Sequence, residues 1–538
     1  MTGSQQANAV ARRDHGRRVA RKFIAALALV VAASTILPAG LGAQQTGTAP
    51  AAVGRPLLPP DLESYIAKGM KLYDLPGLAI GVVFDGQLVY SKGFGVRSKT
   101  SGGGVDTHTL FQIGSTTKAF LATTLAIMVD RGKLKWDDRV VDLDPEFQLQ
   151  DPWVTREFRV FDLLAQRSGL PPYANDNVGF LGADESAMIR SLRYVTPTTS
   201  FRSSFTYTNI THLEAGRIVA KADGLPDWNA VLRKELLDPL GMKDSSYTAA
   251  AIEAAPNHAQ GHRWTPSGTT PIPFTQLFPY NFGGAGDINS DVADMAQWLR
   301  LQLDNGSFGD GRIVSAANLA VTRTPGVAIN DKLLYAMGWI ISLTPNGKVI
   351  WHNGGTGGFG AFVGFSPEKH VGVVILTNEG NNGLPDSVGL WIFDWILGNQ
   401  PVDYVAAAFQ RAKTKYEASE KTFAKPDHPR SFQPLTGLEG DFSNESFGKA
   451  SLASDGGSLV LTLKATGAQL ALDPWDGDIF TTRILPTGLY ASLAGSLGPQ
   501  PLCFAQFQTS EAGKLDLLRL VFDDGQTYVF HREAAAAQ

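Results

Sequence analysis

Residues 111–120 read F-Q-I-G-S-T-T-K-A-F and place a serine, Ser115, three residues before a lysine, Lys118. The segment that follows, A-F-L-A-T-T-L-A-I-M-V-D-R-G, is apolar on nearly every side, which is typical of a core helix, and Gly132 is a typical helix end. Residues three apart share one face of a helix, so the Lys118 amine is expected to reach the Ser115 hydroxyl. The helix dipole favours a developing alkoxide there, and burial lowers the pKa of a lysine. Ser115 and Lys118 are therefore a candidate nucleophile and base, with Ser115 also placed to cap the helix.

A plainer interpretation of Ser-x-x-Lys is a capping serine followed by a surface lysine. The pattern occurs twice more, at 366–369 and 446–449. The copy at 366–369 lies between two strand-like segments and is predicted to be a hairpin turn, and no helix follows the copy at 446–449. Only the Ser115 copy precedes a long apolar helix. The residues around Lys118 are not polar, so a surface position for this lysine fits poorly.

A second proton carrier is expected near such a pair, and the pattern Tyr-x-Asn occurs twice. Tyr173-Ala174-Asn175 lies in L-P-P-Y-A-N-D-N and is predicted to be a surface loop. Tyr207-Thr208-Asn209 lies where a loop leads into a helical pattern. A tyrosine beside a lysine ammonium ionises more easily than its usual pKa of about 10, so Tyr207 is a candidate proton shuttle. A core tyrosine with a satisfied hydroxyl is the alternative.

The segment V-I-W-H-N-G-G-T-G-G-F-G-A-F-V-G-F contains G-x-G-x-x-G at 355–360, but a strand follows these glycines instead of the helix that a dinucleotide site needs. A glycine-rich strand edge lets a substrate lie against the backbone and presents bare N–H groups to an oxyanion. We expect this edge at Gly354 and Gly355. His352 would point into the cleft, although a lone histidine is more often structural.

S-T-T-K at 115–118, Y-T-N at 207–209 and H-N-G at 352–354 together resemble the three motifs of the serine β-lactamase and penicillin-binding protein superfamily. Their order and spacing look like its class C branch, which includes D-aminopeptidases and β-lactamase-like esterases. The segment G-G-A-G-D-I-N-S at 283–290 also looks like this family. The similarity covers roughly 60–400, and the whole architecture resembles the peptidases that cleave linearised microcystin, a peptide with D-residues.

The resemblance implies that Ser115 is acylated and that Lys118 and Tyr207 share the general-base work. It implies that Asn209 holds a substrate amide and that backbone N–H groups of Ser115 and Gly355 form the oxyanion hole. Which of Lys118 and Tyr207 carries the proton stays open, because such pairs titrate together.

The sequence departs from the family at His352, where β-lactamases of this kind carry the lysine of Lys-Thr-Gly. An imidazole is mostly neutral near pH 7, whereas a lysine offers a permanent cation to a substrate carboxylate. This difference weakens the case for a β-lactamase or a strict carboxypeptidase. Internal amides, amino-terminal substrates and esters are favoured instead.

The fold class expected is α/β (α+β): a largely antiparallel sheet flanked by helices, with an inserted helical lobe at about 140–270 and a small C-terminal barrel. Hairpins predicted at Asp85-Gly86 and Asn346-Gly347 support antiparallel pairing between strands from both ends of the catalytic module. The expected domains are a signal peptide (1–43), a linker (44–60), a serine hydrolase domain (61–400), a helical linker (401–434) and a lipocalin-like β-barrel (435–538).

The first 43 residues have a basic start, a 15-residue apolar run and P-A-G-L-G-A, which is typical of a secretory signal. An uncleaved membrane anchor is the alternative. Removing them takes away six basic residues and Asp14 and changes the net charge from −4 to −9, which argues against nucleic acid as a partner. We expect a periplasmic or secreted protein without stable membrane insertion.

The single cysteine, Cys503, allows no intrachain disulfide and is expected to fill a core. No metal cluster is evident, because His258 and His262 lie in a loop pattern with no third ligand. We expect no cofactor.

The leading hypothesis is an exported serine peptidase acting on small peptides with D-residues, through an acyl-enzyme. A carboxylesterase of the same fold, a β-lactamase, and a hydrolase-like binding protein without activity are the alternatives. The presence of all three motifs argues against an inactive binding protein. Oligomerisation is left open.

Overall fold

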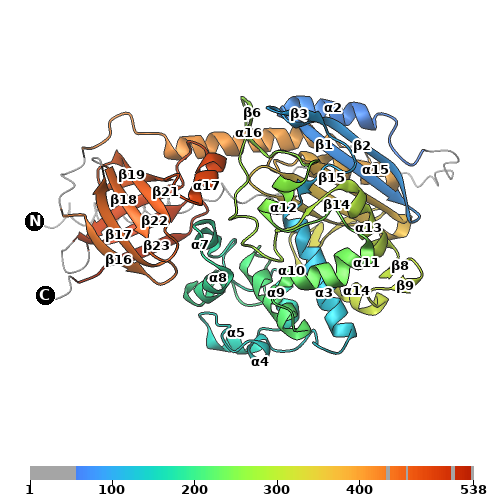
Figure 1. Cartoon of the computed structure of the whole chain (residues 1–538), viewed down its shortest axis with the longest axis horizontal. Helices are drawn as coiled ribbons and strands as arrows, with labels where there is room; N and C mark the ends of the chain where they lie inside the picture. The colour runs from blue at the N-terminus through green and yellow to red at the C-terminus, as the bar shows by residue number, and fades with distance from the viewer. Residues whose placement is uncertain (1–55, 401, 432–436, 456–457, 510–514, 535–538) are drawn as a thin grey trace, which may run out of the picture.

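The computed structural model describes residues 56–400, 402–431, 437–455, 458–509 and 515–534. A nine-stranded antiparallel sheet with helices on both faces forms the larger body, and an eight-stranded closed barrel lies beside it (Figure 1). The long helix α16 (Tyr404–Phe423) runs from one body to the other. The expected fold class is confirmed. The predicted signal segment falls outside the described residues.

The large sheet runs in the order β10-β11-β12-β13-β14-β15-β1-β2-β3, so strands that follow the helical lobe pair with strands that precede it. Its strands are β1 (Gly77–Phe84), β2 (Gln87–Ser98), β3 (Gly102–Gly104), β10 (Val327–Ala328), β11 (Leu333–Tyr335), β12 (Ile340–Thr344), β13 (Gly347–Gly355), β14 (Gly360–Ser366) and β15 (Val371–Thr377). Three two-stranded sheets pair β4 (Phe111–Gln112) with β7 (Asn289–Ser290), β5 (His262–Thr265) with β6 (Gly268–Pro271), and β8 (Ser307–Phe308) with β9 (Gly311–Arg312).

The helices before the barrel are α2 (Leu62–Tyr73), η1 (Gly114–Thr116), α3 (Thr117–Asp130), α4 (Val140–Leu143), α5 (Pro152–Glu157), α6 (Val160–Leu164), α7 (Asp176–Phe180), α8 (Glu185–Ser191), η2 (Leu192–Tyr194), α9 (Ile210–Asp223), α10 (Trp228–Leu232), η3 (Arg233–Leu237), α11 (Asp238–Leu240), α12 (Ala249–Ala254), α13 (Val292–Leu303), α14 (Ala316–Thr322), η4 (Pro367–Lys369), α15 (Leu384–Leu397) and α16. The barrel comprises β16 (Gly440–Asn444), β17 (Gly448–Asp455), β18 (Ser458–Leu463), β19 (Gln469–Asp476), β20 (Ile479–Ile484), α17 (Tyr490–Leu497), β21 (Cys503–Thr509), β22 (Leu515–Phe522) and β23 (Thr527–Arg532).

Strand β1 lies between two cores, which explains why G-L-A-I-G-V-V-F is apolar throughout. Leu78 and Ile80 contribute to the core beneath α2 and α15, while Ala79 and Val83 contribute to the core on the other face, beneath α3 and α13. Side chains alternate along a strand, so a strand covered on both faces has no polar positions.

The predicted Asp85-Gly86 hairpin is present, with both residues at positive φ between β1 and β2. A hairpin also joins β12 to β13, but its turn residues are Pro345 and Asn346 instead of Asn346 and Gly347, because Gly347 already pairs with Thr344. The Ser-x-x-Lys copy at 366–369 forms η4 between β14 and β15, as the hairpin interpretation required. Cys503 is buried in the barrel against Thr482.

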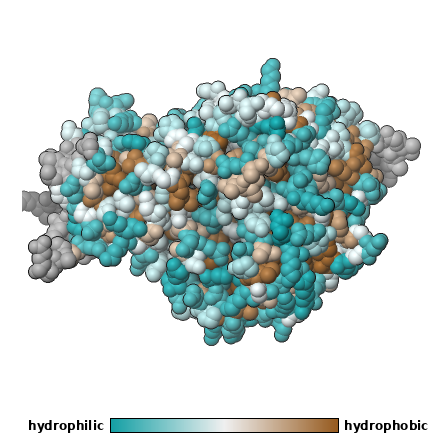
Figure 2. Space-filling model, in the orientation of Figure 1, coloured by the Kyte–Doolittle hydropathy of each residue, from teal (hydrophilic) through white to brown (hydrophobic). Residues whose placement is uncertain are grey.

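On the face shown in Figure 2, hydrophobic residues reach the surface in separate groups among hydrophilic ones. The exposed large apolar side chains of the described residues, such as Leu88, Trp153 and Leu489, are correspondingly scattered. No helix within the described ranges is both long and apolar enough to span a membrane.

Candidate active site

Ser115 lies in η1, the single turn of 3₁₀ helix that leads directly into α3. Every residue of α3 from Thr117 to Met128 is buried, so the helix is a core element as its composition predicted. Thr116 occupies the cap position of α3, and no side chain caps the helix there. The expectation that Ser115 caps its helix is therefore wrong, and its hydroxyl instead contacts Lys118.

Lys118 is completely buried, and its Nζ makes three short polar contacts. They are with Ser115 Oγ at 3.0 Å, Asn209 Oδ1 at 2.7 Å and the carbonyl oxygen of Ala285 at 2.8 Å. The amide and carbonyl oxygens can only accept. A neutral amine has two N–H donors for these oxygens and one lone pair left for the serine O–H.

Burial lowers the pKa of Lys118 from 10.5 to about 7, against the opposing effect of the carboxyls of Asp176 and Asp287, which raise it. Burial also raises the pKa of Asp176 to about 8 and that of Asp287 to about 7. A large share of Lys118 is therefore neutral near pH 7, the form that can accept a proton.

Tyr207 packs its ring beneath the amine, with Lys118 Nζ 4.8 Å from the ring centroid. Its hydroxyl has no well-formed hydrogen bond to any described residue. Burial raises the pKa of Tyr207 well above its usual value, and the nearby Ser115 hydroxyl offsets this only in part. The expectation that Lys118 makes Tyr207 easier to ionise is wrong, because burial raises the pKa of Tyr207 and Lys118 is not among the groups that lower it.

Asn209 stands at the start of α9 and bridges two titratable groups. Its Oδ1 accepts from Lys118, and its Nδ2 donates to Asp176 Oδ2 at 2.5 Å. The side chain thus fixes the position of the Lys118 amine. Asp176 and Ala285 were not predicted to be site residues, although Ala285 lies in the family-like segment G-G-A-G-D-I-N-S.

Strand β13 brings Gly354 and Gly355 directly against the turn that carries the serine. A Cβ on Gly354 would lie 1.9 Å from the carbonyl oxygen of Ile113, so only glycine fits. Gly114 has φ +51°, and a Cβ there would lie 2.7 Å from the nitrogen of Gly355. The two backbones meet in this way beside Ser115, and both Ser115 and Gly355 line the cleft.

His352 is not on the cleft wall, contrary to the expectation that its ring points into the cleft. The ring is 1 % exposed and packs between Tyr207 and Tyr335, with centroid separations of 6.2 and 5.9 Å. Its Nε2 contacts the Tyr335 hydroxyl at 3.1 Å, and burial lowers its pKa to about 3. His352 is a neutral packing residue behind Tyr207.

The cleft over Ser115 has a volume of about 410 Å³, a size suited to a small organic molecule or short peptide. Aromatic side chains of the catalytic body, including Phe274, Phe278 and Phe359, form one wall. Further lining residues come from α16, from α17 and from the β22–β23 turn at Asp523 and Asp524. The barrel is thus part of the cleft.

The segment Tyr173-Ala174-Asn175, expected to be a surface loop, lies in the junction between the two bodies. Gln526 of the barrel accepts from the backbone nitrogen of Asn175 at 2.7 Å and donates to the carbonyl oxygen of Tyr173 at 2.9 Å. The hydroxyl of Tyr528 donates to Asn175 Oδ1 at 3.1 Å. The loop is therefore buried because the barrel covers it, and Tyr173 lines the cleft.

The histidine pair at 258 and 262 does not converge on a common point. His258 Nδ1 contacts the carbonyl oxygen of Ala255 at 2.6 Å, and His262 Nδ1 contacts that of Asn378 at 2.9 Å. Each ring is held by its own backbone partner, as in a structural histidine.

The fold and the buried serine–lysine pair define a class of serine hydrolases, and comparison with known proteins gives the family. The chain belongs to the Beta-lactamase family, whose model matches residues 62–391. The superfamily expected from the three motifs is thereby confirmed.

Two curated relatives and one solved structure illustrate the similarity. The chain is 25% identical to unguisins hydrolase ungD of Aspergillus violaceofuscus, over 84% of this chain and 86% of that protein. It is 28% identical to penicillin-binding protein 4 of Amycolatopsis lactamdurans, over 57% and 82%. The octameric penicillin-binding protein homologue from Pyrococcus abyssi shares the fold, with a TM-score of 0.58 at 23% identity over 87% of this chain and 99% of that one.

Proposed function

We propose that the protein is an exported serine peptidase that acylates Ser115 and cleaves amide bonds in small peptides containing D-residues, such as linearised microcystin. The observation that carries the proposal is the set of contacts at Lys118 Nζ. Nζ lies within hydrogen-bond distance of Asn209 Oδ1, the Ala285 carbonyl oxygen and Ser115 Oγ, so a neutral amine that donates to the first two keeps its lone pair for the Ser115 hydroxyl, 3.0 Å away.

In the proposed first step, Ser115 Oγ attacks the substrate carbonyl while its proton passes to Lys118 Nζ. The lysine needs no prior deprotonation by another group, because its pKa is about 7. Asn209 and Ala285 hold the amine in place, which limits the reorganisation needed for the transfer. Lys118 is thus the general base of the proposal, and this assigns the role that the sequence left open between Lys118 and Tyr207.

The tetrahedral oxyanion would be bound by the backbone N–H groups of Ser115 and Gly355, whose segments meet beside the nucleophile. Tyr207 remains protonated, since burial raises its pKa, and its hydroxyl, close to that of Ser115, can donate a proton to the departing amine. The proton on Lys118 then replaces it. Water completes the cycle by the reverse transfers and releases the acid.

Three features support a peptide substrate. The relative from Aspergillus is named as a hydrolase of unguisins and the one from Amycolatopsis as a penicillin-binding protein. The cleft volume suits a few residues of peptide. Position 352 offers a buried neutral ring in place of a cation, so a terminal carboxylate has no partner there, which favours an internal amide.

A fluorophosphonate probe tests the nucleophile. The mature protein should be labelled, and Ser115→Ala should abolish labelling. Ser366→Ala is a matched control, because Ser366 begins another Ser-x-x-Lys pattern that forms a hairpin turn. Equal labelling of the Ser115→Ala protein would refute the acyl-enzyme.

A carboxylesterase is the second candidate, favoured by the aromatic wall of the cleft, which suits an apolar acyl or alkyl group. Comparing kcat/KM for a D-alanyl peptide, linearised microcystin, a p-nitrophenyl ester and a chromogenic cephalosporin separates these classes. Ester turnover without peptide turnover would replace the peptidase proposal, and preferential cephalosporin turnover would indicate a β-lactamase.

We further propose the domain limits given above, cleavage of the signal near residue 43 and self-association. Self-association is suggested by the Pyrococcus homologue, which is described as octameric. Mass spectrometry of the protein recovered from the periplasm or medium tests the cleavage. Light scattering after size-exclusion chromatography tests the assembly, and a monomer at all concentrations would contradict it.

A further inference from the structure

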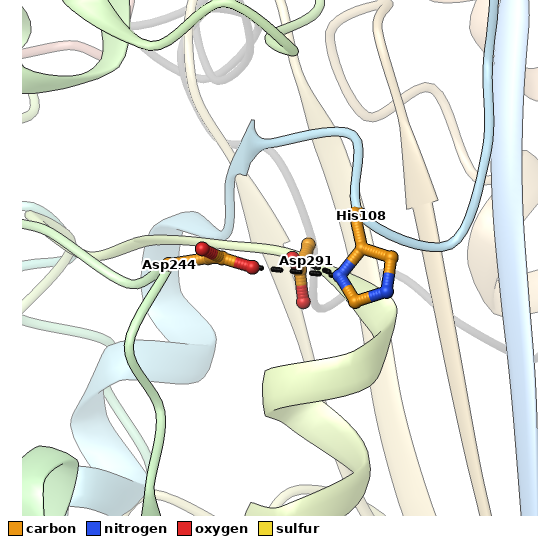
Figure 3. A group of neighbouring side chains, drawn as sticks. All are labelled: His108, Asp244 and Asp291. Atoms are coloured by element: carbon orange, nitrogen blue, oxygen red, sulfur yellow. Dashed lines mark ion pairs between the residues drawn. The ribbon is translucent and has the colours of Figure 1, made fainter.

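A histidine and two aspartates from three separate segments converge beside the β4–β7 sheet (Figure 3). His108 lies in the loop before β4, Asp244 in the loop between α11 and α12, and Asp291 at the start of α13. None of the three lines the cleft over Ser115. One donor atom from each residue lies within 4.8 Å of the other two.

The buried member of the group, Asp291, has an oxygen that receives no hydrogen bond from the described residues. Asp291 Oδ1 caps α13 by accepting from the backbone nitrogen of Asp294 at 2.8 Å. Its Oδ2 makes no hydrogen bond to any described residue, although the side chain is 0% exposed. Burying a carboxylate oxygen without a hydrogen-bond donor is energetically unfavourable. This oxygen points toward His108 and Asp244, where a bound cation would offset that penalty.

The neighbouring carboxylates add negative charge at this site and so favour a bound cation further. Asp244 also carries a carboxylate into the group, and Asp294 lies beside it, accepting from the backbone nitrogen of Asp244 at 3.0 Å. Among the described residues, His108 is the only basic side chain within ion-pair distance of Asp244 or Asp291. One imidazole, charged only when protonated, therefore faces two carboxylates.

The spacing of the donor atoms matches a small metal ion. His108 Nδ1 lies 3.4 Å from Asp244 Oδ2 and 3.6 Å from Asp291 Oδ2. Ligands on a tetrahedral centre with bonds of about 2.0–2.2 Å are separated by roughly 3.3–3.6 Å. The imidazole ligand favours zinc and similar transition metals over calcium or magnesium, which prefer all-oxygen sites.

We propose that His108, Asp244 and Asp291 bind one divalent transition-metal ion of the zinc type, with solvent as the fourth ligand. His108 and Asp244 are 64% and 51% exposed, so the ion and its water have access. The ion would be structural.

The ion would join three segments that support the nucleophile. β4 leads to Ser115 through Ile113 and Gly114, and it pairs with β7 through Phe111 and Ser290. The Asp244 loop joins β7 through paired backbone hydrogen bonds between Ser246 and Asn289. Bound metal would therefore stabilise the layer beneath the active site.

The test uses tag-free mature protein stripped with EDTA and then equilibrated with Zn²⁺. We expect one zinc per chain by elemental analysis, and the visible absorption of four-coordinate Co²⁺ when cobalt replaces zinc. Free zinc at 100 times its Kd should raise Tm by roughly 3 °C, given the size of the chain.

Two variants remove ligands while sparing the fold. His108→Ala changes an exposed side chain, and Asp291→Asn keeps the capping oxygen while replacing Oδ2. Each should weaken zinc binding at least tenfold and so reduce the Tm shift at the same free zinc to about half or less. His370→Asn is the matched control, because His370 also faces two aspartates, but Asp85 contacts its Nδ1 at 3.2 Å and Asp304 its Nε2 at 3.3 Å.

Asp85 and Asp304 thus lie at different ring nitrogens and cannot share an ion with one donor atom of His370, so zinc binding should persist in the control. The proposal is overturned if wild type takes up no zinc, or if His108→Ala and Asp291→Asn bind it as wild type does. Either result would leave ordinary histidine–aspartate ion pairs at this position. The proposed hydrolase activity is not involved in the measurement.

Discussion

Acylation of Ser115 should depend on pH through Lys118, because only the neutral amine can accept the serine proton. With a pKa of about 7, half of Lys118 is neutral at pH 7, whereas at its ordinary value of 10.5 only about 0.03% would be. Burial therefore increases the fraction of enzyme whose Lys118 is neutral at pH 7 by roughly three orders of magnitude. The rate should level off above about pH 8 and fall tenfold per unit at low pH, reaching roughly one hundredth of the plateau at pH 5.

The assay is the second-order rate of fluorophosphonate labelling between pH 5 and 9, since the probe itself does not titrate there. Tryptophan fluorescence at each pH verifies that the protein stays folded. Asp176→Asn adds a second test, because an ionised Asp176 raises the pKa of Lys118 and the amide still accepts from Asn209. The midpoint should shift to lower pH, by less than about one unit, since Asp176 with a pKa of about 8 is only partly ionised.

Asp394→Asn serves as the control, because the Asp394 carboxyl on α15 accepts hydrogen bonds from Tyr404 and Asn399 and is not one of the carboxyls that raise the pKa of Lys118. Its profile should match wild type. A rate that is constant from pH 5 to 9, or one that rises only near pH 10, would show that Lys118 is not the base and would refute the reasoning.

Two further substitutions test the geometry around the serine. Gly354→Ala should reduce labelling about a hundredfold, because its Cβ would displace Ile113 and with it Ser115. Gly357→Ala is the control and should label at nearly the wild-type rate, because its Cβ would meet only Ile272, at 3.7 Å. Equal rates for both variants would contradict the close approach of β13. His352→Lys should lower the free energy of unfolding by about 3–5 kcal/mol in urea titrations, because it buries a cation among Tyr207 and Tyr335, while the neutral His352→Gln should cost less than half as much. A stable His352→Lys protein with improved turnover of carboxylate substrates would instead place this side chain in the cleft.

The fold was predictable where local composition and global packing agree. The all-apolar β1 and α3 could belong only to a core, and the hairpins at Asp85-Gly86 and at Asn346, the latter turning one residue earlier than predicted, set antiparallel pairing. The contact between Ser115 and Lys118 could be predicted because one helical turn fixes their separation. Such features depend on residues close in the chain.

The remaining site features depend on contacts between distant segments. The orientation of His352 follows from how β13 packs against Ile113 and Gly114, and alternation along a strand cannot say which face meets the cleft. The high pKa of Tyr207 follows from complete burial, which no motif encodes. Asp176 was overlooked because its loop has a surface-like composition, and only the barrel, far along the chain, covers it.

The hydrogen bonds from Gln526 and Tyr528 to the 173–175 loop have a consequence for how this protein can be altered. A chain cut after α15 would not be a smaller enzyme, since it would expose the polar atoms of Asn175 and open one side of the cleft to bulk water. Conversely, Asp523 and Asp524 of the β22–β23 turn line the cleft from outside the catalytic body, but Asp524 accepts from Asn177 and Gln526 holds the 173–175 loop. Varying Asp523 alone is therefore a route to new substrate preferences that leaves those contacts and the Ser115–Lys118 pair in place.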